Sequence, residues 1–337
     1  MAGAPLLAAL LCLPLLGTPP KPRSRAEARL AALEARIGGR LGLAVLDTGS
    51  GRRLLHRSAE RFPMCSTFKA LLVGAVLTRV DRGQERLDRP VPFGRSDLLA
   101  HAPVAEARVA EGHLTVEELC AAAVVVSDNT AANLLLRSLG GPGAVTAFAR
   151  SLGDADTRLD RMEPELNQSL PGDPRDTTTP AAMAGSLQAL LLGSALAPAS
   201  RQRLEDWMKA ATTGRQKLRA GLPATWGVGD KTGAGDRGTM NDLAILRPPG
   251  RAPLLVAAFL TGSRASWNAR EAALAEIGRI VAEAFGEGPI ETPPGPPARA
   301  GTGGTAGGAS RHVANPPLGP SGIPRAGGAL EFSKCVQ

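Results

Sequence analysis

Apolar residues recur at two different spacings along this chain of 337 residues, and the order of these spacings constrains the fold more than any other feature. Short apolar runs bounded by Gly and Pro, which are typical of strands, lie towards both ends of the apolar part of the chain. They fall at residues 41–47, 53–56, 226–231, 242–246 and 254–260. Helical spacing fills the middle of the chain. The two ends therefore predict one antiparallel sheet with an inserted all-helical subdomain, which is an α+β fold.

The first 23 residues differ from the rest in composition. They contain an apolar run at 6–16, which has the length of a signal-peptide core and is too short to span a membrane. We predict a signal peptide over 1–23. No Lys or Arg precedes the apolar run, so a wrongly assigned or frayed start is the alternative.

The folded domain is expected over residues 24–286. Its α/β part would comprise 24–57 and 212–286, and its helical part 58–211. Hydrophobic residues make up 43% of the chain, which is enough for a core. Residues 287–337 are dominated by Gly, Pro, Ala and Ser. Such a segment cannot bury enough apolar surface to fold, so we predict a disordered tail.

Charge and side-chain chemistry exclude two classes of function. Lys and Arg number 39 against 31 Asp and Glu, a net charge of +8, but the arginines are scattered among acids rather than clustered. Aromatic residues are 3% of the chain and tyrosine is absent, so few rings could stack on bases. We expect no nucleic-acid partner. The four Cys and four His show no metal-ligand spacing, so we expect no metal site.

The sequence Ser66-Thr67-Phe68-Lys69 opens the most apolar predicted helix. Ser66 would lie at the helix N-terminus, with Lys69 about one turn further along the same face. A serine hydroxyl becomes a nucleophile when a base takes its proton, and a desolvated lysine beside it can be that base. The alternative is a plain helix cap, because serine is a good N-cap residue.

Three further motifs follow this pair along the chain. Ser127-Asp128-Asn129 begins a predicted helix, Glu163-Pro164-Glu165-Leu166-Asn167 lies in a long loop, and Lys231-Thr232-Gly233 ends a predicted strand. Each is common by itself, as a cap, a solvated loop or a turn. The S-x-x-K, S-D-N and K-T-G motifs in this order are the signature of class A β-lactamases and penicillin-binding proteins.

From about residue 26 to 285 the chain resembles the class A serine β-lactamases, because the residues around the motifs match the family as well. The resemblance implies an antiparallel five-stranded sheet flanked by helices, an inserted all-helical subdomain, and an active site between them. It also implies the activity, which is hydrolysis of the β-lactam amide of penicillins and early cephalosporins through a serine acyl-enzyme. Neither a metal nor a cofactor is needed for that reaction.

The resemblance assigns the catalytic residues. Ser66 attacks the lactam carbonyl, and either Lys69 or Glu163 acting through a water takes its proton. Ser127, assisted by Lys231, passes a proton to the departing lactam nitrogen. Glu163 then activates the water that hydrolyses the acyl-enzyme.

The resemblance also assigns the groups that bind substrate. The backbone N–H groups of Ser66 and Ala234 would form the oxyanion hole. Asn129 would hold the substrate's side-chain amide, and Thr232 of the K-T-G motif its carboxylate. Asn167 would position the hydrolytic water together with the loop glutamate. The substrate-binding set is Asn129, Asn167, Thr232, Gly233, Ala234, Lys217 and Phe93.

The last two of these residues depart from the family pattern. Lys217 replaces an arginine of some members and is assigned as a second cation for the substrate carboxylate, with a solvated lysine as the alternative. Phe93 falls where the family often has an aromatic residue at the cleft mouth, with plain packing as the alternative. Arg161 and Asp176 would form an ion pair across the neck of the glutamate loop.

Two cysteines of the folded domain are expected to be free thiols. Cys65 and Cys120 match positions that form disulfides in some family members. The corresponding partner positions are occupied here by Gly235 and Val73.

We therefore predict an exported monomeric β-lactamase, periplasmic or secreted and without a stable membrane anchor. One alternative is a penicillin-binding DD-peptidase or serine esterase that uses the same Ser66 and Lys69. Another is an inactive penicillin-sensing module. Glu163 favours the hydrolase, because penicillin-binding proteins are trapped as stable acyl-enzymes.

Overall fold

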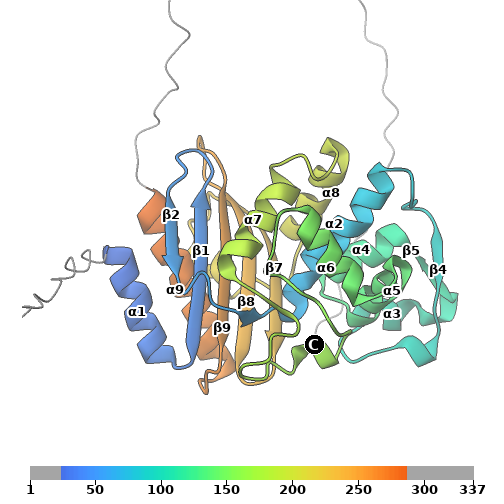
Figure 1. Cartoon of the computed structure of the whole chain (residues 1–337), viewed down its shortest axis with the longest axis horizontal. Coiled ribbons are helices and arrows are strands. Elements are labelled where there is room, and N and C mark those ends of the chain that lie inside the picture. Colours follow the sequence, from blue (N-terminus) through green and yellow to red (C-terminus); the bar gives the residue numbers. More distant parts are fainter. Residues whose placement is uncertain (1–23, 287–337) are drawn as a thin grey trace, which may run out of the picture. The chain divides into compact units, whose positions relative to one another are not determined.

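The sheet predicted from the two ends of the chain is present and has five antiparallel strands in the order β2-β1-β9-β8-β7 (Figure 1). The computed structural model describes residues 24–286. The strands are β1 (Arg40–Asp47), β2 (Arg53–His56), β7 (Gly227–Gly235), β8 (Thr239–Arg247) and β9 (Leu254–Thr261). The α+β class predicted from the sequence is thus confirmed.

Alternating side chains of the sheet pack in two different cores. On β8, Leu243 and Ile245 face the helical part, whereas Ala244 and Leu246 pack with the two helices that cover the opposite face. These covering helices are α1 (Arg25–Ile37) and α9 (Trp267–Gly286) (Figure 1). Because a strand's side chains point alternately to its two faces, both faces are buried here.

The inserted part is helical, with two small two-stranded sheets. Its helices are α2 (Phe68–Asp81), α3 (Pro103–Arg108), α4 (Val116–Val125), α5 (Asn129–Leu139), α6 (Pro142–Ser151), α7 (Pro180–Leu191) and α8 (Pro198–Lys209). Its short strands are β3 (Phe62–Pro63) with β6 (Thr177–Thr178), and β4 (Pro90–Pro92) with β5 (His113–Thr115). Single 3₁₀ turns are η1 (Cys65–Thr67), η2 (Arg95–Asp97), η3 (Val109–Glu111), η4 (Glu165–Asn167) and η5 (Leu218–Gly221).

Helix α2 is buried along nearly its whole length. Its side chains from Phe68 to Thr78 are buried, and it packs against α4, α5, α6 and α8. A helix that is apolar all round is expected at the centre of a domain rather than at its surface. It therefore provides a rigid base for the serine that precedes it.

The S-D-N motif begins a helix as predicted, because Asp128 is the N-cap of α5. Two motifs lie differently from the sequence-based expectation. Ser66 lies in η1, directly before α2 begins. The K-T-G motif lies inside β7, which continues to Gly235 instead of ending at Lys231. The strand continues there because its backbone pairs with β8. The prediction rested on apolar side chains, which are few in these last residues of the strand.

None of the helices within residues 24–286 is long and apolar enough to cross a membrane. The predicted signal peptide and the predicted disordered tail lie outside the described residues.

Candidate active site

The serine of the first motif is held on a tight turn. Cys65, directly before it, has a positive φ of 46°, a conformation that is strained for a non-glycine residue. The turn is closed by the Thr67 hydroxyl, which donates to the Met64 carbonyl at 2.7 Å. Ser66 consequently points its hydroxyl into a nearly buried site, where Oγ donates to Glu163 Oε1 at 3.1 Å.

Lys69 projects into the same site from the first turn of α2. Its fully buried ammonium donates to the Ser127 carbonyl at 2.8 Å and to Asn129 Oδ1 at 2.6 Å, and it lies 3.1 Å from Glu163 Oε1. Burial lowers the pKa of Lys69 below its ordinary value, while the charge of Glu163 opposes that shift. The three acceptors match the three protons of an ammonium group.

Glu163 reaches the site from the long loop, and it is clamped at both its backbone and its side chain. The Asn133 amide donates to the Glu163 carbonyl at 2.8 Å and accepts from the Glu163 N–H at 3.0 Å. Asn167 Nδ2 donates to the second carboxylate oxygen, Oε2, at 2.5 Å. The carboxylate is thus fixed between Ser66 and Asn167.

The S-D-N segment supplies a hydroxyl from the opposite wall. Asp128 is buried, and its carboxylate accepts from the backbone N–H groups of Ala131, Val104 and Ala105, which fixes the segment to α3 and α5. Ser127 has a positive φ of 61°, and its Oγ accepts from Lys231 Nζ at 2.9 Å and lies 3.3 Å from Lys69 Nζ.

Strand β7 forms the remaining wall, and it is an edge strand of the sheet. Lys231 is buried on it, and burial together with the nearby charge of Lys69 holds the pKa of Lys231 well below its ordinary value. Thr232 Oγ1 lies 2.6 Å from Thr213 Oγ1. A Cβ on Gly233 would lie 2.7 Å from the Met64 carbonyl oxygen, so only glycine lets the strand approach the serine turn this closely.

Lys217 lies beside this wall but does not present a free cation. Its ammonium donates to the Thr213 carbonyl at 2.7 Å and to Glu271 Oε1 at 3.1 Å, and the residue is 4% exposed. The alternative of a solvated lysine is wrong. Lys217, the expected second cation, is paired with Glu271. It is connected to Thr232 only through Thr213, whose carbonyl accepts from Lys217 and whose hydroxyl contacts Thr232.

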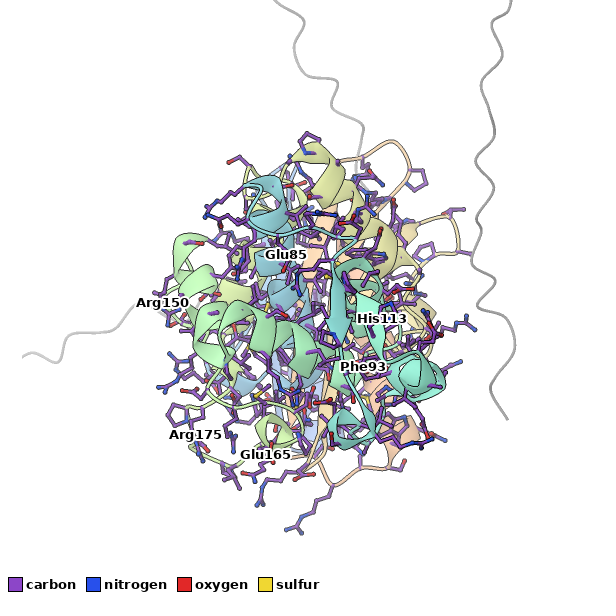
Figure 2. All side chains as sticks on the ribbon, turned by 90° about the vertical axis from the view of Figure 1, so that its right-hand side faces the viewer. Glu85, Phe93, His113, Arg150, Glu165 and Arg175 are labelled. Atoms are coloured by element: carbon purple, nitrogen blue, oxygen red, sulfur yellow. The ribbon has the colours of Figure 1, made fainter. Side chains whose placement is uncertain are left out.

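Phe93 is not in the site, and its predicted position at the cleft mouth is corrected. The ring is buried in the core of the helical part, and the Phe93 N–H donates to the Gly112 carbonyl at 3.0 Å. Figure 2 shows it beside His113, at the small β4–β5 sheet. The packing alternative is the one that the structure supports.

Two residues of the site were not predicted from the sequence. His101 is exposed, has a positive φ of 57°, and accepts from the Asn129 N–H through its carbonyl at 3.0 Å, so it borders the S-D-N wall. Asn133 clamps Glu163 as described above. Asn133 lies within the string that resembles the family, but nothing in its spacing signals a contact with a loop thirty residues later.

The expected neck pair and free thiols are present. Arg161 Nε donates to Asp176 Oδ2 at 2.6 Å, and the carboxylate is buried. Cys65 and Cys120 are both free and buried. Burial raises the pKa of the Cys65 thiol to about 12, so it is an unreactive neighbour of Ser66.

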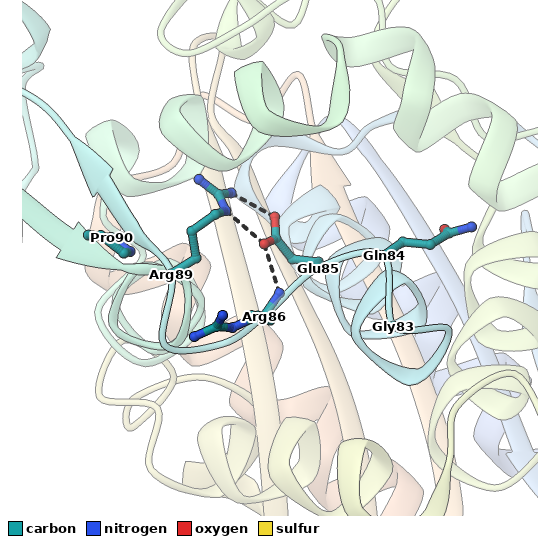
Figure 3. A pocket seen from close by; sticks show the side chains of 6 residues that line it. All are labelled: Gly83, Gln84, Glu85, Arg86, Arg89 and Pro90. Carbon is teal, nitrogen blue, oxygen red and sulfur yellow. Dashed lines mark hydrogen bonds and ion pairs between the residues drawn. The ribbon is translucent and has the colours of Figure 1, made fainter.

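Two other kinds of site were sought in residues 24–286. No group of three or more His, Cys, Asp or Glu side chains is placed to hold a metal ion there. Figure 3 shows a hollow lined by Gly83, Gln84, Glu85, Arg86, Arg89 and Pro90. These residues follow the C-terminal end of α2, whereas Ser66 precedes its N-terminal end. Glu85 and Arg89 pair with each other inside the hollow, so neither charge is left for a ligand.

Comparison with known proteins gives one consistent result. The model of the beta-lactamase enzyme family matches residues 25–285. Beta-lactamase L2 of Stenotrophomonas maltophilia is 52% identical over 257 residues, 76% of this chain and 84% of L2. Beta-lactamase AST-1 of Nocardia asteroides is 49% identical over 261 residues, 77% of this chain and 84% of AST-1.

Solved structures agree with these sequence matches. An ancestral class A β-lactamase is 62% identical, with a TM-score of 0.76, and the match covers 77% of this chain and 100% of that one. A putative class A β-lactamase from Rhodopseudomonas palustris is 57% identical, with a TM-score of 0.76, and the match covers 78% of this chain and 100% of that one.

Proposed function

The chain belongs to the β-lactamase enzyme family, as a class A serine β-lactamase that hydrolyses β-lactams and so gives resistance to them, and from this premise we propose how its residues divide the reaction. The proposal rests on one observation above all. The Glu163 carboxylate faces the Ser66 hydroxyl at 3.1 Å, inside a site closed by two buried lysines.

Acylation begins with attack of Ser66 Oγ on the lactam carbonyl carbon. Glu163 is the proposed base, because Ser66 already donates to it, whereas the Lys69 protons are directed at three other acceptors. Lys69 stabilises the carboxylate and the developing negative charge. The oxyanion is held by the backbone N–H groups of Ser66 and Ala234.

Cleavage of the amide requires a proton for the departing nitrogen. Ser127 Oγ accepts from Lys231 and lies within reach of Lys69, so its own proton is directed away from both ammonium groups. We assign that proton to the lactam nitrogen. The proton that Glu163 took from Ser66 replaces it by way of Lys69, which lies 3.1 Å from Glu163 Oε1 and 3.3 Å from Ser127 Oγ, so Glu163 is again a carboxylate before deacylation. Lys231 assists by donating to the Ser127 hydroxyl and holding it in place.

Deacylation requires a water between the ester and a base. Asn167 donates to Glu163, and its own carbonyl oxygen, Oδ1, is buried with no hydrogen-bond partner among residues 24–286. That oxygen and Glu163 Oε1 are the acceptors proposed for the hydrolytic water. The Glu163 carboxylate takes one water proton while the water oxygen attacks the ester carbon, and it gives that proton to Ser66 Oγ, 3.1 Å away, as the ester bond breaks.

Substrate is proposed to lie along β7, with its carboxylate at Thr232 and Lys231 and its side-chain amide at Asn129. Lys217 and Glu271 act on the carboxylate end through Thr213, which touches Thr232. Penicillins and early cephalosporins are the proposed substrates.

The active unit is proposed to be a monomer, because every assigned side chain comes from one chain. Export is proposed from the apolar run at 6–16.

Burst kinetics with a chromogenic cephalosporin test this function. We expect many equivalents of product per enzyme, since Glu163 regenerates Ser66 in each cycle. Release of one equivalent followed by no further product would instead indicate a DD-peptidase or a penicillin sensor.

A further inference from the structure

Asn241 is a fully buried amide, 0% exposed, on β8, the strand next to the edge strand β7, where it stands between Met240 and the buried Asp242. It lies opposite Gly233 of the K-T-G motif on β7 and opposite Phe259 on β9. Its Nδ2 donates to the Pro63 carbonyl at 2.8 Å and to the Met64 carbonyl at 3.0 Å. Both carbonyls belong to the segment that leads directly into the Ser66 turn.

The amide is not the residue that sheet packing alone would favour. Its Oδ1 is buried with no hydrogen-bond partner among residues 24–286. An unpaired buried carbonyl carries a desolvation cost that an apolar side chain of the same size would avoid. The two donated hydrogen bonds offset that cost: the Pro63 carbonyl receives a donor, and the Met64 carbonyl accepts from Asn241 in addition to Thr67.

These two hydrogen bonds connect the parts of the site that carry the proposed oxyanion donors. One donor, the Ser66 N–H, lies on the turn that follows Met64. The other, the Ala234 N–H, lies on β7 next to Gly233, and β7 is joined to β8 along its whole length. Asn241 therefore reaches from the sheet to the turn at the point where the two parts touch.

The turn needs such a support. Cys65 has a positive φ, and its strain persists only if the surroundings hold it. A Cβ on Gly233 would lie 3.1 Å from the Thr67 backbone nitrogen, so the strand and the turn are already in contact and a small shift would change their spacing. An oxyanion hole works only when both donors lie about 2.7–3.1 Å from the oxyanion.

We propose that Asn241 is a positioning residue of the oxyanion hole, which fixes the separation of the Ser66 and Ala234 N–H groups through the carbonyls of Pro63 and Met64. This role rests on the proposed function. It assigns Asn241 no contact with substrate.

The first test replaces Asn241 with leucine, which keeps the size and removes both donors. We expect the kcat/KM for a slowly acylated cephalosporin and the affinity for a boronic acid analogue of the tetrahedral intermediate to fall together, by about tenfold or more. The matched control is Thr261→Val, which removes a buried hydrogen bond to Thr239 on the same sheet, away from the turn. It should lower the melting temperature and leave both quantities within about twofold.

The second test is Asn241→Asp, which keeps the shape. An ionised carboxylate repels the two carbonyls, whereas a protonated one can donate to one of them. We therefore expect the kcat/KM of this variant, relative to the unmutated enzyme, to rise as the pH is lowered. A purely structural asparagine would not produce that rescue.

The proposal is overturned if Asn241→Leu folds and retains both quantities within about twofold of the unmutated enzyme. If the leucine variant does not fold, the aspartate variant decides, and a ratio that stays flat with pH overturns the proposal. Absence of turnover by the unmutated enzyme in the same assay would instead refute the proposed function.

Discussion

Removing the guanidinium at the neck of the glutamate loop should both destabilise the fold and slow deacylation. The Asp176 carboxylate is 1% exposed and accepts from the Asp160 N–H at 2.8 Å, the Arg161 N–H at 2.9 Å and Arg161 Nε at 2.6 Å. Arg161→Ala deletes the only cation among these donors and leaves the carboxylate buried.

The loss of stability depends on the hydrogen bonds that Asp176 keeps in the variant. Breaking a buried ion pair costs about 3–5 kcal/mol, and the two retained backbone donors place this case at the lower end, about 3 kcal/mol. For a domain of this size that corresponds to a fall in melting temperature of roughly 6–12 °C. Glu163 lies on the loop that the neck closes. Lys69 can substitute for it as the base in acylation but not in activating the hydrolytic water, so the deacylation rate should fall more than the acylation rate.

Calorimetry and pre-steady-state kinetics measure the two effects. The matched control is Arg175→Ala on the same loop, whose exposed pair with Asp173 should contribute about 0–1 kcal/mol. The reasoning is refuted if Arg161→Ala loses no more stability than Arg175→Ala and deacylates at the unmutated rate.

Three further predictions concern the strand side of the site. A Cβ on Gly235 would lie 2.6 Å from Cys65 Sγ, so Gly235→Cys should form a disulfide with Cys65 under oxidising conditions. The denatured variant should then have one titratable thiol fewer than the unmutated protein, and one more would contradict this. Burial and the charge of Asp230 raise the pKa of Asp242 well above its ordinary value. Between the ordinary pKa and this raised pKa, the folded protein holds a proton that the unfolded chain has released, so the stability of the fold falls as the pH rises through that range. Asp242→Asn should remove this loss and melt higher than the unmutated protein at about pH 8, and a lower melting temperature there would be the opposite result. Lys217→Ala should raise the KM for a penicillin several-fold with little change in kcat, and an unchanged KM would remove Lys217 from substrate binding.

The sequence was sufficient to predict which residues lie together where a short motif marks them. Ser66, Lys69, Ser127, Glu163 and Lys231 meet in one site, because each motif fixes a local geometry and the sheet brings the motifs together. Short apolar runs bounded by Gly and Pro, towards both ends of the apolar part of the chain, were likewise enough to predict the sheet.

The sequence was insufficient where a role depends on a contact between distant residues. Phe93 was placed at the cleft mouth from the family resemblance, although it is a core residue, and His101 was missed. The segment between α2 and α4 has no strong apolar periodicity that could have corrected either prediction. The pairing of Lys217 with Glu271, and the reach of Asn241 to Met64, depend on how the sheet and the helices pack, which no local pattern encodes.

The most direct test of the account is the intact mass of Glu163→Gln after mixing with a penicillin. Glutamine keeps the shape and the hydrogen bond from Asn167 but cannot take a proton from water. Removing the Glu163 charge lowers the pKa of Lys69 further, so Lys69 can replace Glu163 as the base for acylation, but deacylation has no such substitute. The account therefore predicts that the protein gains the mass of one penicillin on Ser66 more slowly than the unmutated enzyme is acylated, and that the adduct persists. Ordinary multiple turnover by this variant, with no adduct, would contradict the role of Glu163 on which the mechanism depends.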